Sequence, residues 1–431
     1  MRRSDPLAAE AAASPEPRPG AGTFDAEPSP GAASASADKS GGEALFAVGL
    51  ALPLFAGGNT FLALEPKDGM AVFALVSTLV VGWLVHSQGP TATSPRGPVL
   101  VAHVCLLGLG VWWMAALAFR PSGPRAFLEA QGIFCGILLF TMLSRRPLAP
   151  DAIGRFVRGL TVGTLGTAAL SQYQYWIAGP RTAPLAEAAG LTVITDLNAN
   201  FYNANCYAAF LAAVSLVVAT RAIADRDPVA RIALPILLVT LLLSKSKAAI
   251  ALFALGAIVL AGIAGWRPRA LRNRFAIDAL WVLLPAAAGA AAALVDLNEL
   301  WGTGTLGRLA IWRAGLAMFQ DHWLGGVGLG RFADFFVEYR VNTYYTRYPH
   351  NFLLEIAAEL GVLGLVGAVG FLAAAFAGPV AKLAAAARTR AVSPLSAAIV
   401  VASSILVVHG LVDIDWHAPA NPILLFTLLG A

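Results

Sequence analysis

The chain is dominated by apolar stretches of about 17 to 25 residues, which recur from residue 44 almost to its end. A helix rises 1.5 Å per residue, so a stretch of this length can cross the roughly 30 Å hydrocarbon core of a bilayer. The stretches therefore predict membrane-spanning helices. The predicted spans are residues 44–64, 69–85, 99–119, 126–143, 156–177, 201–220, 229–243, 248–266, 275–295, 352–380 and 394–412.

Composition supports this interpretation, because 58% of the residues are hydrophobic and only 13% are charged, against roughly 25% charged in soluble proteins. The fold class expected is all-α, a polytopic integral membrane helical bundle of about 11–12 transmembrane helices. A further apolar run at 421–431 is too short to span, so we expect either a truncated chain or a half-inserted end. The span at 229–243 is short and contains Pro235, and a re-entrant helix is the alternative there.

Three regions are expected along the chain. Residues 1–43 are rich in Ala, Ser, Pro and Gly, which predicts a disordered tail. Residues 44–200 hold the first five spans, and residues 201–431 hold the remaining spans. This last region includes a long loop at 296–349 that is expected to carry short amphipathic helices.

The basic residues predict the orientation of the chain in the membrane. If every span crosses, nineteen Lys and Arg residues lie on the side of the amino-terminal tail, and six lie in the short loops of the opposite side. The positive-inside rule then makes the amino terminus cytoplasmic and exports the loop 296–349. The basic residues form no single patch, so no nucleic-acid partner is expected. Cys105, Cys135 and Cys206 all lie in apolar runs, which excludes a disulfide framework or a Cys-rich metal site.

The predicted topology brings several polar motifs to the exported face of the membrane. In chain order these are NANCYAAFL from Asn203, SKSKAA from Ser244, GRLAIWRAGLAMFQDHWLGGVGLGRF from Gly307, HNFLLEIAAELGVLGL from His350 and HGLVDIDWHAP from His409. Their order and spacing resemble the O-antigen ligase and polymerase family of membrane glycosyltransferases. The resemblance covers about residues 203–431.

The resemblance implies a twelve-helix enzyme of the bacterial inner membrane with its active site on the exported, periplasmic face. It implies transfer of a glycan from an undecaprenyl diphosphate carrier to an acceptor hydroxyl, with inversion and without a metal or cofactor. The acceptor is a glycolipid such as lipid A-core, a glycan or a protein. Ligase is preferred, and a polymerase or a protein O-oligosaccharyltransferase is the alternative within the family.

Such a reaction needs cations for the diphosphate and one base for the hydroxyl. Arg308 is predicted to bind the diphosphate from the first turn of a helix capped by Thr303 or Thr305, and a snorkelling interfacial Arg is the alternative. Arg313 is about 140° further round that helix and is interpreted as structural. His350, expected at a helix amino end, is the predicted base or acceptor-orienting group.

Five further residues complete the predicted site. Lys247 stands where the family typically has Arg and is expected to contact the diphosphate with help from Lys245, although headgroup-facing lysines are an equal alternative. Asn205 and Glu359 are expected to support the cavity, and Arg331 is a further substrate-binding candidate. The structural alternative for Glu359 and Glu355 is a carboxylate pair in which at least one binds a basic residue or a helix amino end.

Other motifs suggest competing functions that we set aside. GGVGLGR lacks the spacing of a nucleotide-binding loop and predicts a tight turn that lets the backbone approach the membrane or the donor. His322, His409 and His417 with Asp413 and Asp415 are too irregularly spaced for a metal site, and Asp413 is expected to brace a neighbouring Arg. A lipid or sugar transporter is less favoured, because the polar residues crowd the exported helix ends instead of the bilayer midplane.

Overall fold

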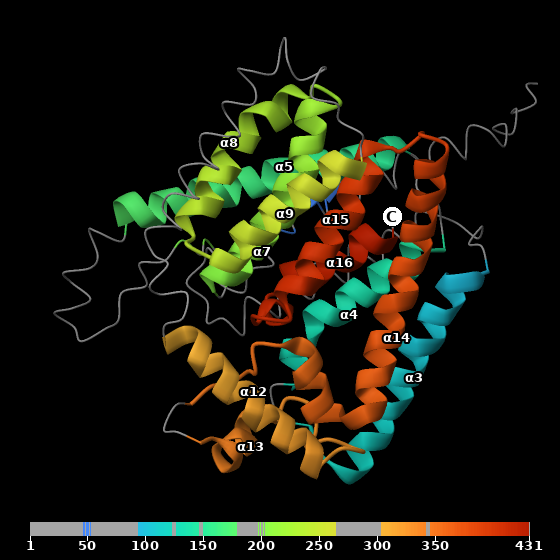
Figure 1. Ribbon diagram of the computed structural model, residues 1–431, viewed down its shortest axis with the longest axis vertical. Helices are drawn as coiled ribbons and strands as arrows, with labels where there is room; N and C mark the ends of the chain where they lie inside the picture. The colour runs from blue at the N-terminus through green and yellow to red at the C-terminus, as the bar shows by residue number, and fades with distance from the viewer. Residues whose placement is uncertain are drawn as a thin grey trace, which may run out of the picture.

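The computed structural model describes the larger part of the chain, which is folded into helices (Figure 1). No β-strand occurs in this part, which agrees with the all-α prediction. The predicted tail at 1–43, the span at 69–85, the span at 275–295 and most of the span at 44–64 lie outside it. The described residues are 46–47, 49–50, 52, 94–122, 126–145, 150–178, 197, 199, 201, 203–263, 303–341 and 345–430.

Each predicted span that lies wholly or mostly within the described residues corresponds to a helix. The helices of the described part, including α12, α13 and α16 outside the predicted spans, are α3 (Gly97–Phe119), α4 (Ala126–Leu143), α5 (Pro150–Tyr173), α7 (Ala204–Ile223), α8 (Pro228–Leu243), α9 (Lys247–Ile263), α12 (Thr303–Asp321), α13 (Phe332–Tyr339), α14 (Phe352–Arg388), α15 (Pro394–His409) and α16 (Ala420–Gly430). A π-helical turn, η1 (Gln174–Ala178), extends α5, and a 3-10 turn, η3 (Asp415–His417), precedes α16. Helix α8 runs through Pro235 without interruption.

Three helices of the described part, α3, α7 and α14, are long and apolar enough to cross a membrane. Helix α3 exposes large apolar side chains around its surface, including Leu107, Val111 and Met114, as expected for a helix that faces lipid. Five further apolar segments, within α4 and in α8, α9, α15 and α16, are shorter. The number of about 11–12 spans therefore stays a prediction.

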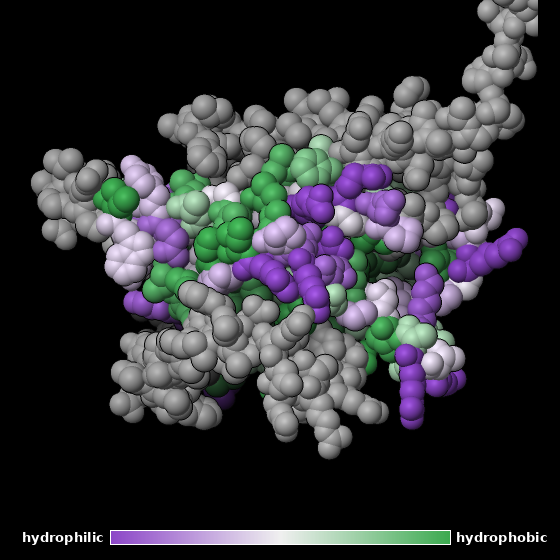
Figure 2. Space-filling view, turned by 90° about the horizontal axis from the view of Figure 1, so that it is seen from above, coloured by the Kyte–Doolittle hydropathy of each residue, from purple (hydrophilic) through white to green (hydrophobic). Residues whose placement is uncertain are grey.

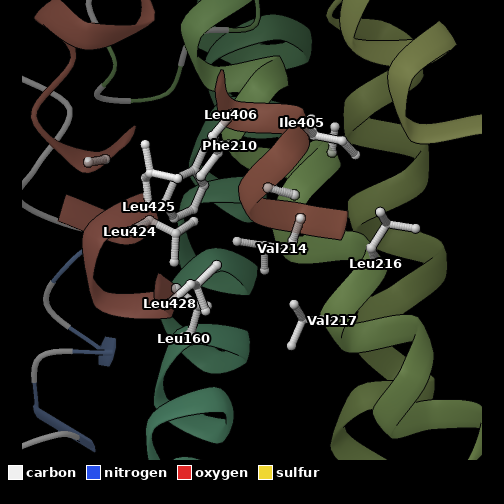
Figure 3. Close-up of a cluster of buried hydrophobic side chains, with 14 of the residues drawn as sticks. Leu160, Phe210, Val214, Leu216, Val217, Ile405, Leu406, Leu424, Leu425 and Leu428 are labelled. Carbon is white, nitrogen blue, oxygen red and sulfur yellow. The ribbon is translucent and has the colours of Figure 1, made fainter. Parts of the chain in front are cut away.

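Helix α7 forms the centre of the bundle and packs against α5, α8, α9 and α15. Four small side chains, Ala208, Ala209, Ala212 and Ala213, are fully buried and allow these neighbours to approach closely. Figure 3 shows where the larger side chains of α7 meet those of α5, α15 and α16. The labelled members of this cluster are Leu160, Phe210, Val214, Leu216, Val217, Ile405, Leu406, Leu424, Leu425 and Leu428.

One end of the bundle carries helices α12 and α13, and the other end carries the charged turn between α7 and α8. Helices α12 and α13 lie together at one end (Figure 1), which is the end predicted to be exported. At the turn between α7 and α8, Asp227 caps α8 through the backbone N–H groups of Val229 and Ala230. It also pairs with Arg221 at 3.3 Å and with Arg158 at 3.6 Å. Seen from above in Figure 2, away from α12 and α13, hydrophilic side chains gather between hydrophobic ones.

Helix α14 is broken at Gly361, whose backbone has φ 68° and ψ −165°. In an unbroken helix the N–H of Val362 would donate to the carbonyl of Ala358. It donates instead to the carbonyl of Trp323, at 2.7 Å. The break separates a short amino-terminal segment, residues 352–360, from the long apolar part of α14.

The turn between α12 and α13, which we call the glycine turn, fills the break in α14. Gly326, Gly328 and Gly330 all have positive φ angles, so the predicted tight turn is confirmed. Its backbone approaches α14: a Cβ on Gly326 would lie 2.2 Å from the carbonyl of Glu359. The break frees three backbone carbonyls of α14, and each accepts a hydrogen bond from outside the helix. The N–H of Val327 donates to Ala358 O at 2.9 Å, and the N–H of Gly328 donates to Glu359 O at 3.0 Å. The indole of Trp112 donates to Leu360 O at 2.8 Å.

Replacing Gly361 by Ala should therefore destabilise the protein by about 1–3 kcal/mol. The new Cβ would lie 2.2 Å from the carbonyl oxygen of Leu324, in a backbone conformation that L side chains rarely adopt. Thermal unfolding in detergent would measure the loss. Gly378→Ala, in the same helix but with open space at its Cβ, is the matched control and should be neutral or slightly stabilising. Equal melting temperatures for the two variants would contradict this account of the break.

Candidate functional site

The carboxylate of Asp413 is the meeting point of three predicted site residues. Its Oδ2 accepts a hydrogen bond from Nη2 of Arg308 at 2.8 Å and from Nδ2 of Asn205 at 2.9 Å. Its Oδ1 lies 3.3 Å from Nδ1 of His350 and accepts from the N–H of Ile414 at 2.9 Å. We call Asp413, Arg308, Asn205 and His350 the Asp413 cluster. The prediction that Asp413 braces a neighbouring Arg is confirmed.

Local backbone structure places each partner of Asp413. Asn205 is held at the start of α7, where its N–H donates to the side chain of the N-cap residue Asn203 at 2.7 Å. His350 has a left-handed φ of 55° immediately before Asn351, the N-cap residue of α14. The indole of Trp312 on α12 donates to the carbonyl of Pro349 at 2.9 Å, which ties Arg308's helix to His350's segment.

Arg308 lies in the second turn of α12, because that helix begins at Thr303. The prediction of a first-turn position was therefore wrong, and the free amides of the helix end are not adjacent to this side chain. The guanidinium combines its bond to Asp413 with partial accessibility, since 33% of the side chain is exposed. Arg313 lies on the exposed side of the same continuous helix, as predicted from the 140° rotation.

Asp413 carries a negative charge although only 3% of its side chain is exposed. Burial acts to raise the pKa of this carboxyl. The hydrogen bond from His350 and the charge of Arg308 outweigh burial, so the pKa lies below its ordinary value of 3.8. The cluster therefore combines a fixed anion with a partly accessible cation and an imidazole that is 21% exposed.

His409 and Asp415 close the turn that carries Asp413. Sequence analysis considered these two residues only as possible metal ligands. His409 ends α15 and Asp415 begins η3, and His409 Nδ1 lies 2.6 Å from Asp415 Oδ2 with both side chains fully buried. The N–H of Asp413 donates to the carbonyl of His409 at 3.0 Å. In the described part of the chain, no three His, Cys, Asp or Glu residues are grouped to hold a metal ion.

The predicted lysines lie beside α9 and are not members of the Asp413 cluster. Lys247 is the first residue of α9, and Lys245 occupies the preceding turn with a φ of 58° and an exposed side chain. Helices α7 and α8 form an antiparallel pair, so this turn lies at the same end of the pair as Asn205. A role for the two lysines in binding diphosphate stays a prediction.

Arg331 belongs to the amino end of α13 and not to the Asp413 cluster. Its Nε lies 3.4 Å from Oδ2 of Asp334, and its guanidinium lies 4.9 Å from the centre of the Phe335 ring. These are local contacts within one helix turn. Substrate binding by Arg331 stays a prediction, and the structure does not bring it to the other cations.

Both carboxylates of the short amino-terminal segment of α14 are paired, as expected for acids in a membrane helix. Glu359 is buried and accepts from the backbone N–H groups of Gly330 at 2.7 Å and Phe332, the first residue of α13, at 2.9 Å. Glu355 binds Nε2 of His417, at 2.9 Å and 3.0 Å from its two oxygens. Glu359 therefore fixes the glycine turn, and Glu355 forms a separate pair with His417.

These features define a helical membrane protein with a cation, a carboxylate and a histidine gathered at the helix ends. A family model described as O-antigen ligase matches residues 232–369. This match confirms the resemblance found in the sequence: residues 232–369 are similar to the O-antigen ligase family. The matched range contains Lys247, Arg308 and His350, whereas Asn205 and Asp413 lie outside it. No curated protein matches the chain.

Asp413→Asn should lower the stability of the protein at pH 7 by about 2–3 kcal/mol, because Arg308 loses its buried counter-charge. The pKa of Asp413 is depressed in the folded state, so its contribution is complete above the ordinary value of 3.8 and is lost as pH falls below that value. Thermal unfolding of both proteins between pH 7 and pH 3 would show the difference shrinking at the acidic end. A difference that is independent of pH would contradict this role.

Proposed function

We propose that the chain is a membrane-embedded glycosyltransferase of the ligase type that takes its glycan from undecaprenyl diphosphate. The observation that supports this most is the convergence of Arg308 and His350 on the buried carboxylate of Asp413. The match of residues 232–369 to the O-antigen ligase model supports a ligase or polymerase activity of this general kind. The proposed location is the bacterial inner membrane, with the amino terminus cytoplasmic and the site on the exported face.

The proposed reaction breaks the bond between the anomeric carbon and the diphosphate and forms a bond from that carbon to the acceptor oxygen. Negative charge grows on the departing undecaprenyl diphosphate, and the accessible part of the Arg308 guanidinium is proposed to stabilise it. Lys247 is proposed to add a second positive charge. Attack from the face opposite the leaving group inverts the anomeric centre, and this scheme needs no metal or cofactor.

His350 is proposed to accept the proton of the acceptor hydroxyl. With Nδ1 protonated toward Asp413, the neutral ring presents Nε2 as an acceptor. The carboxylate of Asp413 then stabilises the imidazolium that forms when the proton is transferred. Asn205 orients the same carboxylate from α7, so its role is positioning and not proton transfer.

Arg308→Ala should reduce glycan transfer by about 100-fold or more, because the developing diphosphate charge loses its cation. Transfer would be measured in reconstituted vesicles that contain an undecaprenyl diphosphate oligosaccharide and candidate acceptors. Arg313→Ala removes the same charge from the exposed side of α12 and should leave the rate within about twofold. Equal losses in the two variants would contradict a specific role for Arg308.

His350→Ala should lower kcat by about 100-fold or more while the KM for the donor changes little, since the base acts in the transition state. His103→Ala is the matched control, because that imidazole lies on α3 and binds the carbonyl of Val99. The accepted partner in the wild-type assay separates the alternatives: a lipid A-core glycolipid indicates a ligase, a growing glycan a polymerase and a protein an O-oligosaccharyltransferase. Movement of intact donor across the bilayer without transfer would replace the proposal by a transporter.

A further inference from the structure

A cavity of about 80 Å³ lies between α4, the glycine turn, the amino-terminal segment of α14 and η3. Its walls are mostly apolar, with Ile133 from α4, Leu329 from the turn, and Phe352 and Ile356 from α14. Ala126, Gly330 and Trp416 complete the apolar walls, and Glu355, Glu359 and His417 supply the polar groups. None of these residues belongs to the Asp413 cluster.

Glu355 and His417 form a fixed carboxylate–imidazole pair at this cavity. Both oxygens of Glu355 lie within 3.0 Å of His417 Nε2, and the two side chains are only 14% and 15% exposed. The imidazole ring also stacks on the buried ring of Tyr348, with 3.8 Å between ring centres and 28° between planes. The pair is therefore held by contacts on more than one side, as a preorganised binding group should be.

The chemistry of the cavity selects the kind of ligand that fits it. Each oxygen of Glu359 accepts its own backbone N–H group, whereas the two oxygens of Glu355 share one nitrogen of His417. Glu355 is therefore the carboxylate with acceptor capacity left for a ligand. A carboxylate repels phosphate and accepts a hydrogen bond from a hydroxyl group. The apolar walls suit the C–H surface of a sugar ring next to that hydroxyl. The cavity thus fits a neutral, hydroxyl-bearing carbon skeleton and disfavours the diphosphate.

The cavity is adjacent to the Asp413 cluster along both chain segments that build it. Phe352 follows His350 by two residues, and Trp416 follows Asp413 by three. The two aromatic rings stack with 4.1 Å between centres and 10° between planes, and both line the cavity. The stacked pair therefore connects the cavity to the two chain segments that carry His350 and Asp413.

We propose that this cavity is the acceptor subsite, in which Glu355, held by His417, binds a hydroxyl group of the acceptor sugar. The proposal rests on the proposed function, since it assigns the second substrate of that reaction. Under this proposal the Asp413 cluster and the Glu355–His417 pair have separate tasks. The Asp413 cluster binds the anionic donor, and the Glu355–His417 pair binds the neutral acceptor.

The test compares two substitutions in the cavity with two matched substitutions outside it. Glu355→Gln removes the charge but keeps the shape, and Ile133→Phe fills the cavity. The controls are Glu338→Gln, on the exposed side of α13, and Ile137→Phe, one turn along α4 and outside the cavity walls. The assay measures the KM for the acceptor and for the donor, with the core oligosaccharide of lipopolysaccharide as the acceptor.

Both cavity variants should raise the acceptor KM about tenfold or more and leave the donor KM within about twofold, whereas the controls should match wild type. An unchanged acceptor KM in Glu355→Gln, or an equal rise in the donor KM, would overturn the proposal. Transfer to a protein hydroxyl instead of a sugar would overturn it as well.

Direct binding distinguishes failure of the subsite from failure of the proposed function. Binding of the core oligosaccharide to the full-length protein in detergent, without donor, would be followed by saturation-transfer NMR. Binding that is lost in Glu355→Gln and kept in Glu338→Gln supports the subsite even if wild type transfers nothing, in which case only the proposed function fails. Binding that is equal in wild type and Glu355→Gln overturns the subsite whatever the transfer assay shows.

Discussion

The buried carboxylate of Asp413 sets the arrangement of the site, because a charge with 3% exposure must be matched by partners in its immediate surroundings. Those partners come from residues 208, 105 and 63 positions away in the chain. Asn205 fixes the start of α7, Arg308 fixes α12 and His350 fixes the residues just before α14. One buried carboxylate therefore joins three separate elements at one end of the bundle.

A second constraint, the break in α14, determines where the segment between α12 and α13 can lie. Breaking a helix at Gly361 frees backbone groups that must find other partners in an apolar environment. The glycine turn supplies them, and only residues without a Cβ allow the close approach seen at Gly326. Glu359 reinforces the contact by accepting two further N–H groups from the turn. The break is thus a docking site for the turn, and the amino-terminal segment of α14 is positioned next to η3.

Sequence analysis predicted the described helices well, because a long apolar run in a membrane protein has few alternatives to a helix. The run at 126–143 coincides with α4, and the other predicted ranges differ from the observed helices mainly at their ends. It also singled out Arg308 and His350 and expected Asp413 to brace an Arg, but it did not show that this Arg is Arg308 or that His350 shares the same carboxylate, since those contacts depend on packing between distant segments. Periodicity likewise could not show that Arg331 binds Asp334 within its own turn, away from the other cations.

The amino-terminal segment of α14 and the turn around η3 together carry two groups of opposite character. Before Phe352 and Trp416 in the chain, these segments carry His350 and Asp413, which pair with each other and with Arg308. The Glu355–His417 pair lies further along the same two segments. A transferase must keep an anionic leaving group and a neutral nucleophile in adjacent but chemically distinct surroundings. Because Phe352 stacks on Trp416, a shift of α14 relative to η3 would move both groups together.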